Sequence, residues 1–509
     1  MYTKVNSMMV QGIDGLFISV ETDVSAGLPE FSMVGYLSSE VREARERVRI
    51  SLKNSGFALP PRRITVNLSP ADLRKEGTSF DLAVALGILA SYGHLPEQCL
   101  RRLAVIGELG LDGGVRPVPG VLSMVGAAKE AGVSGCIVPK ENEAEGALVE
   151  EMAVAGVENL PEAVRLLQTP GAWQERIREP VWTPEDRPNY GEDFSEVNGQ
   201  IALKRAAEVA AAGMHNLLMI GPPGSGKTMV ARRIPTILPE LTRKESLEVS
   251  KIYSVCGLLP PDRPLKTERP FRAPHHTASY QSLVGGGRVP KPGELSLANR
   301  GVLFLDELPE FPKVSLEVLR QPLEDRAVRI SRVQGSYLFP ADCMVVAAMN
   351  PCRCGYYPDR SRCQCGEAEV KRYLRRISRP LLDRMDLCVE APAIGFEAVR
   401  AEGENETSAQ IRSRVREAWE RQRYRLKDAG IDCNAQMTGR HVKTFCRLDE
   451  QEESMMAHIF EKLGLSARAY HRILKVARTI ADLDGEDKIM ERHLGEALGY
   501  RGLEQRFWG

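Results

Sequence analysis

A glycine-rich segment, GPPGSGKT at residues 221–228, contains the residue types that bind a polyphosphate. It follows a short apolar run and precedes a helix-like pattern, which is the context of a phosphate-binding loop (P-loop) rather than of a fortuitous turn. Its backbone N–H groups and the amino end of the next helix are expected to face the phosphates. Lys227 is expected to contact the β- and γ-phosphates, and Thr228 to hold Mg²⁺. The expected loop consists of Gly221, Pro222, Pro223, Gly224, Ser225 and Gly226.

Two adjacent carboxylates, Asp306 and Glu307, follow the apolar run VLFL downstream of this loop. Adjacent acids after an apolar run are common by chance, but their position after a P-loop favours a function. Asp306 is expected to complete the Mg²⁺ shell through water, and Glu307 to polarise the attacking water. Both residues therefore belong to the predicted nucleotide site.

Four of the eleven cysteines lie between residues 350 and 366, as two Cys-X-Cys pairs. Four thiolates suit tetrahedral Zn²⁺, and they leave no open position for catalysis at the metal. Cys-X-Cys is tighter than the common Cys-X2-Cys, so a packed cluster without metal and a redox-active cluster remain alternatives. The candidate ligands of a structural zinc are Cys352, Cys354, Cys363 and Cys365.

The composition is that of a soluble globular chain of 509 residues, with 68 basic and 68 acidic side chains. Any contact with nucleic acid must therefore come from local patches of charge. No apolar stretch approaches the length of about 18 residues that spans a membrane, and the N-terminal sequence has no secretory signal. We expect a cytoplasmic protein without a membrane partner.

The chain is predicted to be an α/β multidomain protein. Residues 1–168 alternate strand-like and helix-like runs, and 169–195 read as a linker rich in polar residues. A second α/β region covers 196–392 and contains the cysteine-rich insertion 350–366, while 393–509 are mostly helical by pattern. One predicted helix of the last region places on one face the apolar residues Ile411, Val415, Ala418 and Trp419.

The segments RPFRAPHHTASYQSLVGGG, PGELSLANRGVLFLDELPEF and ISRPLLDRMDL, with the P-loop, resemble the magnesium-chelatase-like branch of the AAA+ ATPases. Over essentially the whole chain the sequence resembles the YifB/ComM family. This resemblance implies an AAA+ core with a helical C-terminal lid, ATP and Mg²⁺ as cofactors, and assembly into a hexameric ring. It also implies a helicase that drives DNA branch migration in recombination or natural transformation.

The same resemblance assigns roles to residues outside the P-loop. Asn350 matches sensor 1, which orients the lytic water, and Arg384 matches the arginine finger that reaches a neighbouring subunit. Arg468 matches sensor 2 of the lid, and Gln200 lies where the family's chain passes the adenine. For each of these arginines, and for the nearby Arg379, a surface ion pair is the alternative.

The first region has segments, VNLSPADLRKEGTSFDLAVALGILA among them, that resemble the proteolytic domain of Lon, with its ribosomal S5 domain 2-like fold. Ser79 falls at the position of the Lon nucleophile, but Leu122 falls at that of its lysine base. A leucine cannot accept the proton of a serine, so we expect the fold without peptidase activity. Two roles remain for this domain, DNA binding and organisation of the ring, and the sequence does not choose between them.

Two segments are expected to reach DNA phosphates through mobile cations. One is a β-hairpin predicted from the alternation in RAVRISRVQGSYLFPADCMVV, which in this branch faces the central pore. The other is the glycine- and proline-rich loop LVGGGRVPKPGELS. For each cation the alternative is solvated surface charge. The candidates are Arg329, Arg332, Arg288 and Lys291.

The adjacent histidines His275 and His276 could suggest a metal site. Adjacent histidines point apart in most backbones, so we expect that they pack or belong to a substrate loop. The sequence gives no further reason to choose between these two roles.

Three functions are compatible with these observations. The first is a hexameric AAA+ motor that acts on DNA. The second is a magnesium-chelatase-type motor subunit that works on a protein or tetrapyrrole partner, and the third is a scaffold that ATP assembles. The chelatase subunit, as the resemblance implies, lacks the Lon-like domain and the cysteines, and the presence of Glu307 and Arg384 argues against the scaffold. The first hypothesis is therefore preferred.

Overall fold

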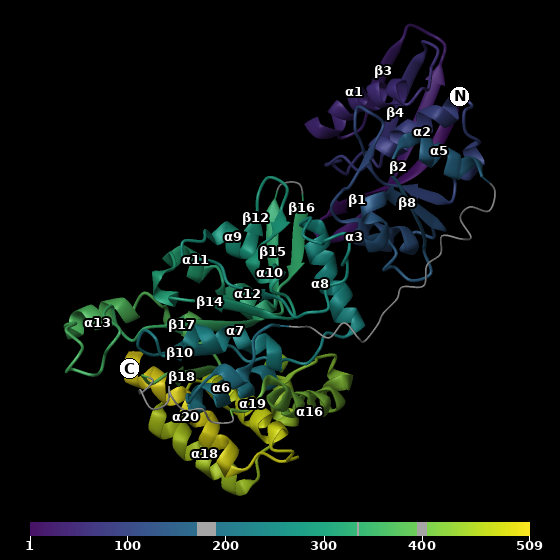
Figure 1. The fold of residues 1–509 in the computed structure, drawn as a ribbon. Helices are drawn as coiled ribbons and strands as arrows, with labels where there is room; N and C mark the ends of the chain where they lie inside the picture. The colour runs from purple at the N-terminus through teal and green to yellow at the C-terminus, as the bar shows by residue number, and fades with distance from the viewer. Residues whose placement is uncertain (170–189, 333–334, 394–404, 509) are drawn as a thin grey trace. The chain divides into compact units, whose positions relative to one another are not determined.

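The computed structural model describes residues 1–169, 190–332, 335–393 and 405–508, and these fall into two compact units (Figure 1). The predicted linker 169–195 lies largely outside the described residues, and the domain boundaries stay predictions. The first unit is formed by Met1–Asp186, Arg243–Lys266 and Arg329–Phe339. The second unit is formed by Arg187–Thr242, Thr267–Val328 and Pro340–Gly509.

The first unit is built on a seven-stranded mixed sheet with the order β3-β4-β2-β1-β5-β8-β9. The β1–β2 and β2–β4 pairs are antiparallel, and the other pairs are parallel. The strands are β1 (Tyr2–Gln11), β2 (Asp14–Ser25), β3 (Glu30–Val34), β4 (Arg63–Ser69), β5 (Leu103–Val105), β8 (Gly135–Pro139) and β9 (Ala153–Val157). A short hairpin joins β6 (Glu108–Leu109) and β7 (Val115–Arg116).

Helices cover both faces of this sheet. Successive residues of a strand point to opposite faces, and Met9 of β1 packs in one hydrophobic cluster with α2, while Met8 packs in another with α3. The apolar segment DLAVALGILAS forms α2, and all its residues are buried. The helices are α1 (Ser39–Asn54), α2 (Asp81–Ser91), α3 (Val121–Glu130), α4 (Glu143–Gly146), α5 (Leu160–Gln168) and α8 (Arg243–Val255).

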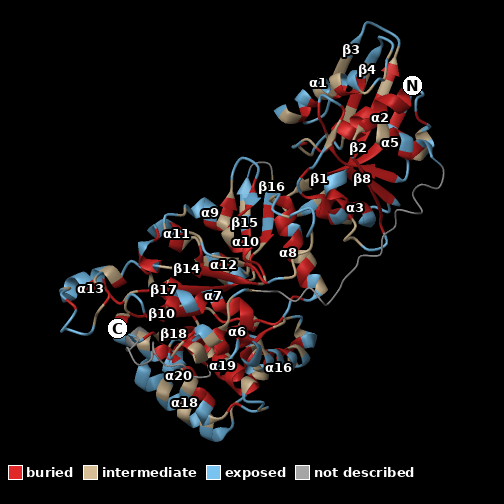
Figure 2. Ribbon diagram, viewed as in Figure 1, coloured by how far each residue is buried: buried red, intermediate tan, exposed pale blue. Residues whose placement is uncertain are grey.

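The second unit contains a five-stranded, all-parallel sheet with the order β11-β14-β17-β10-β18. Its central strands are continuous apolar runs, as expected for a parallel sheet with both faces covered, and they are buried in Figure 2. The apolar runs before the P-loop and before Asp306 form strands β10 and β14, and strand β17 precedes Asn350. The strands are β11 (Phe271–Arg272), β14 (Val302–Leu305), β17 (Met344–Met349), β10 (Leu217–Ile220) and β18 (Leu387–Glu390).

The strand order determines which loops lie next to each other at the carboxyl edge of the sheet. Because all strands are parallel, their carboxyl ends lie along one edge, which is where ligands bind in such sheets. Strand β17 lies between β10 and β14, so the segments that follow these three strands are neighbours (Figure 1). The P-loop, the two carboxylates and Asn350 follow them in turn.

Helices flank the sheet and extend to the C-terminus. The helical segment after residue 405 shares one hydrophobic cluster with α6 and the sheet, so it is packed onto the nucleotide-binding part. In α16 the predicted apolar face is confirmed, since Ile411, Val415, Ala418 and Trp419 are buried. The main helices are α6 (Ile201–Gly213), α7 (Lys227–Ile237), α13 (Glu367–Leu374), α14 (Arg379–Leu382), α16 (Ser408–Leu426), α17 (Gly439–Phe445), α18 (Glu450–Leu463), α19 (Ala467–Leu483) and α20 (Glu491–Trp508).

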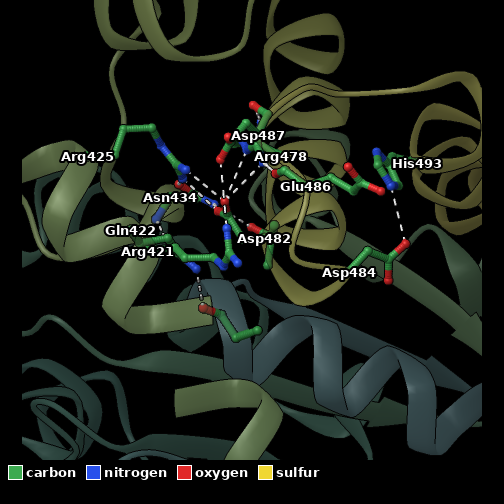
Figure 3. Close-up of polar contacts among 12 residues, drawn as sticks. Arg421, Gln422, Arg425, Asn434, Arg478, Asp482, Asp484, Glu486, Asp487 and His493 are labelled. Carbon is green, nitrogen blue, oxygen red and sulfur yellow. Dashed lines mark hydrogen bonds and ion pairs between the residues drawn. The ribbon is translucent and has the colours of Figure 1, made fainter. Parts of the chain in front are cut away.

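A buried polar network ties these C-terminal helices together (Figure 3). The Asp482 carboxylate accepts hydrogen bonds from Arg425 at 2.6 and 2.7 Å, from Asn434 at 2.8 Å and from Arg478 at 3.2 Å. Gln422 of α16 donates to the carbonyl of Ala212 in α6 at 2.8 Å. Since buried charges are tolerated only when paired, this network fixes one arrangement of α16 and α19.

Of the helices in the described part of the chain, none combines the length and the apolar character that a membrane crossing requires.

Candidate nucleotide-binding site

The P-loop connects β10 to α7 and is held from both sides. Gly221 N donates to the carbonyl of Met349 at 3.1 Å. A Cβ atom at Gly221 would lie 2.2 Å from the carbonyl oxygen of Ala391, so only glycine fits there. Gly226 caps α7 with a φ of 80°, a left-handed conformation that favours glycine. The sequence thus folds the loop around the amino end of α7, as the spacing predicts.

Lys227 points into the loop. Its Nζ atom donates to the carbonyls of Gly221 and Pro222, each at 2.8 Å, and to Ser225 Oγ at 3.2 Å. It also lies 3.5 Å from Asn350 Oδ1. Burial lowers the pKa of Lys227 to about 8, while the charge of Asp306 opposes that shift. Phosphate oxygens, as acceptors with negative charge, suit this ammonium group.

The two carboxylates stand beside the start of α7. Thr228 Oγ1 donates to Asp306 Oδ2 at 2.9 Å, so this hydroxyl and this carboxylate offer the oxygen ligands that Mg²⁺ prefers. Asp306 Oδ1 accepts the backbone N–H of Glu307 at 2.9 Å. Glu307 has a φ of 51°, unusual for a residue other than glycine, and its side chain is 58% exposed. Its carboxylate is therefore accessible to water.

A cavity of about 160 Å³ lies where these segments meet. It brings together four residues that the sequence singles out, and four others that the sequence analysis missed. Arg353 could have been noticed, because it lies three residues after Asn350, whereas no sequence pattern marks Tyr373. The lining consists of Lys227, Asp306, Glu307, Glu310, Met349, Asn350, Arg353 and Tyr373.

Gln200 lies on the other side of the P-loop. Its Nε2 atom donates to the carbonyls of Ser225 at 3.1 Å and of Pro392 at 2.7 Å. Its Oε1 atom is buried and accepts no hydrogen bond from the described residues. A buried acceptor without a partner is costly, and an amino group such as that of adenine would satisfy it. The residues present therefore fit a nucleotide with Mg²⁺.

The predicted arginine finger and sensor 2 share one acidic partner. Arg384 forms an ion pair with Glu324, and Arg468 Nη2 lies 3.9 Å from the same carboxylate. Neither arginine lines the cavity described above. Arg379 donates to the carbonyl of Trp508 at 3.2 Å. Within one chain, the mostly buried Arg384 and the exposed Arg468 thus pair with the same carboxylate, and their catalytic roles stay predictions.

The two adjacent histidines pack against each other. The rings of His275 and His276 have centroids 4.0 Å apart, so these two side chains do not point apart, and a role in a substrate loop stays a prediction. His276 Nδ1 is 3.2 Å from Glu307 Oε2. The strand order brings β11 beside β14, and this explains a contact that sequence spacing does not indicate.

The four clustered cysteines converge. Their Sγ atoms all lie within 4.8 Å of one another, and Cys352 and Cys363 are buried. The remaining cysteines lie elsewhere in the described part of the chain and form no disulfide. The two Cys-X-Cys pairs thus meet at one point in the structure.

At the Lon-like positions of the first unit, the hydroxyl of Ser79 is bound to the main chain. Ser79 Oγ donates to the backbone carbonyl of Met8 at 3.1 Å, and the residue is 7% exposed. Leu122 is 1% exposed, and its backbone N–H donates to Glu145 at 2.8 Å. The serine is therefore engaged with the main chain.

The predicted DNA contacts lie on the surface. The β-hairpin is confirmed as the pair β15 (Ala327–Arg332) and β16 (Gly335–Pro340), with its turn outside the described residues. Tyr337 of β16 lies beside Gly12 of the β1–β2 turn. The side chains of Arg329, Arg332, Arg288 and Lys291 are exposed, and a role in DNA binding stays a prediction for each.

A parallel sheet with a P-loop after one strand and paired acids after another defines the class of P-loop nucleotide-binding proteins. Comparison with known families and proteins narrows this class. Residues 193–399 match the family "Magnesium chelatase, subunit ChlI", 20–142 match "Subunit ChlI of Mg-chelatase", and 405–501 match "Magnesium chelatase, subunit ChlI C-terminal".

Similar proteins extend over nearly the whole chain. It is 43% identical to "Competence protein ComM" of Haemophilus influenzae, over 98% of this chain and 97% of that protein. It is 41% identical to "Uncharacterized protein YifB" of Salmonella typhimurium, over the same shares. A partial similarity, 28% identity over 27% of this chain and 28% of the other, relates it to "Lon protease 2" of Bacillus subtilis. The chain belongs to the YifB/ComM family of magnesium-chelatase-like AAA+ proteins, and this membership indicates an ATPase.

Proposed function

We propose that this protein is a Mg-ATP-dependent AAA+ motor that acts on DNA as a hexameric ring. We propose that it catalyses branch migration in recombination or natural transformation. The observation that carries the ATP-dependent part is the convergence of Lys227, Asp306, Glu307 and Asn350 on one cavity. The name of the similar competence protein supports the DNA-dependent part.

Each residue of the cavity has a separate task in hydrolysis. Lys227 and the loop N–H groups bind the phosphates, while Thr228 and Asp306 hold Mg²⁺, which neutralises charge on the phosphate oxygens when it is bound. Glu307, exposed beside the cavity, polarises the attacking water. Asn350 is placed 3.5 Å from Lys227 and orients that water.

In the proposed ring, assembly brings an arginine of the neighbouring subunit to the nucleotide site. The Arg384 side chain is 14% exposed and forms an ion pair with the half-exposed carboxylate of Glu324. In a ring, this guanidinium reaches the nucleotide of the neighbouring subunit and stabilises the charge of the transition state. Hydrolysis then depends on assembly, and Arg468 acts from the C-terminal helices as sensor 2.

The alternative function is a motor subunit of magnesium chelatase, which the matched family descriptions favour. The N-terminal region itself matches a description of a chelatase subunit at 20–142. That region therefore gives no argument against the chelatase, contrary to the sequence analysis. The similarity to the competence protein over nearly the whole chain is the observation that keeps the DNA motor in first place.

The ATPase rate separates these functions. It should be measured without DNA, with single-stranded DNA and with a four-way junction, using the Glu307→Gln variant as the blank. A motor that contacts phosphates is stimulated by DNA, and the stimulation weakens as salt is added. A rate that is the same with every DNA would contradict the proposal and favour the chelatase alternative.

A further inference from the structure

We propose that Cys352, Cys354, Cys363 and Cys365 bind one Zn²⁺, and that this metal holds the 350–366 segment against the P-loop. The proposal has two parts, a metal site and a mechanical consequence for the nucleotide site. The first part is independent of what the protein does, and the second rests on the proposed ATP site.

The positions of the sulfur atoms match a tetrahedral cage. Cys352 Sγ lies 3.3 Å from Cys354 Sγ and 3.7 Å from Cys363 Sγ, and Cys354 Sγ lies 3.6 Å from Cys363 Sγ. In a tetrahedral site with Zn–S bonds of about 2.3 Å, the sulfur atoms lie about 3.8 Å apart. One ion thus fits among the four thiols, all of which are free.

The local backbone supports these positions without a hydrophobic core. Gly355 N donates to the carbonyl of Cys352 at 3.0 Å, in a turn that places the N–H of Tyr357 3.4 Å from Cys352 Sγ. Such N–H donors favour the thiolate that a metal requires. Cys363 N donates to the carbonyl of Asp359 at 2.8 Å.

Residues 358–362, which lie between the two Cys-X-Cys pairs, are all exposed and give the segment no apolar core. A short segment without an apolar core needs a staple such as a structural metal. This favours a metal site over a cluster of thiols that merely pack.

The 350–366 segment contacts the P-loop through Gly355. A Cβ atom at Gly355 would lie 2.4 Å from Pro223 Cδ, so Gly355 packs against the ring of Pro223 where a larger residue would not fit. Gly355 also has a φ of 88°, which favours glycine independently. The metal site is therefore anchored directly on the loop that binds phosphate.

Two further contacts connect the segment to its surroundings. Arg353, between the first two cysteines, lines the nucleotide cavity. The ring of Tyr357 meets that of Phe507 in α20, with centroids 6.2 Å apart and an angle of 60°. A rigid segment therefore braces the P-loop from α20, and loss of the metal releases both Gly355 and Arg353.

The first experiment measures the metal in the purified full-length chain by mass spectrometry. We expect about one zinc per chain that survives gel filtration with EDTA. Replacement by Co²⁺ should give the strong thiolate charge-transfer bands of a tetrahedral centre. A chain without zinc, a chain with iron instead, or the weak bands of octahedral Co²⁺ would overturn the metal site.

Variants identify the ligands. The double variant Cys352→Ser/Cys363→Ser should lose its zinc, whereas the matched control Cys99→Ser, a cysteine of the first unit, should keep it. If the double variant fails to fold, Cys365→His serves instead, because a histidine ligand keeps the zinc and shifts the Co²⁺ spectrum. Full zinc in a folded double variant, or an unshifted spectrum with Cys365→His, would overturn the assignment.

The second part is tested by binding of a fluorescent ATP analogue before and after zinc is removed with a strong chelator. We expect affinity to fall about tenfold on removal and to recover when Zn²⁺ is added back. Unchanged affinity in zinc-free protein would overturn the bracing of the P-loop and leave the metal site intact. Absence of binding in untreated protein would instead contradict the proposed ATP site, so the two failures are distinguishable.

Discussion

The nucleotide cavity of the second unit and the Lon-like position of the first unit differ in the groups that surround them. In the cavity, a lysine, two adjacent carboxylates and an amide from three separate segments meet. In the first unit, Ser79 donates to a main-chain carbonyl, and a buried leucine stands where the base is expected. From this comparison we expect that the first unit keeps a fold without peptidase activity, because function depends on the groups that converge in a site rather than on the fold.

The largest effect is expected from Glu307→Gln, which removes the group that polarises water but keeps its size. ATP hydrolysis should fall by about 10²–10⁴-fold, the usual contribution of a general base, while ATP binding is kept. Initial rates of phosphate release, with binding of a fluorescent analogue as the control, measure the two effects. Hydrolysis near the wild-type rate would contradict the role of Glu307 and would show that ATP does not react in this cavity.

Arg384→Ala tests whether the cavity is completed by a neighbour. Hydrolysis should fall by about 10²–10³-fold, as for loss of one donor to the transition state. Mixing this variant with Lys227→Ala should restore part of the rate, because mixed rings contain some sites with an intact P-loop and an intact neighbouring arginine. No recovery at any ratio of the two variants would count against an arginine acting across subunits.

Lys227→Ala removes the ammonium group that lies inside the P-loop. Affinity for ATP should fall by about 10–100-fold, from the loss of charged hydrogen bonds of about 1.5–3 kcal/mol. The measurement is a titration with the fluorescent analogue, and Lys244→Ala of the first unit serves as a matched surface control. Wild-type affinity in Lys227→Ala would show that phosphate is bound elsewhere.

Ser79→Ala tests whether Ser79 of the first unit has only a structural role. It should leave ATP hydrolysis unchanged and should cost about 0.5–1.5 kcal/mol of stability, the worth of the hydrogen bond to Met8. Denaturant unfolding and the ATPase rate test this. A peptidase activity in the wild type that Ser79→Ala abolishes would contradict the view that the first unit has lost its chemistry.

The parts of the nucleotide site that depend on short stretches of sequence could be predicted. The spacing of Lys227 and Thr228 after the glycines fixes their place at the start of α7, and the apolar runs before Asp306 and Asn350 predict the strands that carry them. These features depend on short stretches of sequence. The sequence alone therefore indicates the loop, the strands and the α/β class.

Contacts that depend on strand order or on distant packing were not predictable. His276 meets Glu307 because β11 lies beside β14, and no periodicity along the chain specifies that neighbour. Gly355 meets Pro223 because two loops converge at one sheet edge. The common partner of Arg384 and Arg468, Glu324, is likewise a matter of tertiary packing.

The central claim, a motor that uses ATP to move DNA strands, is tested most directly with a labelled four-way junction that carries homologous arms. The account predicts that wild-type protein with Mg-ATP resolves the junction into two duplexes by branch migration. It also predicts that the Glu307→Gln variant binds the junction and leaves it intact. A junction that stays intact while wild-type protein hydrolyses ATP, or one that Glu307→Gln resolves equally fast, would contradict the account.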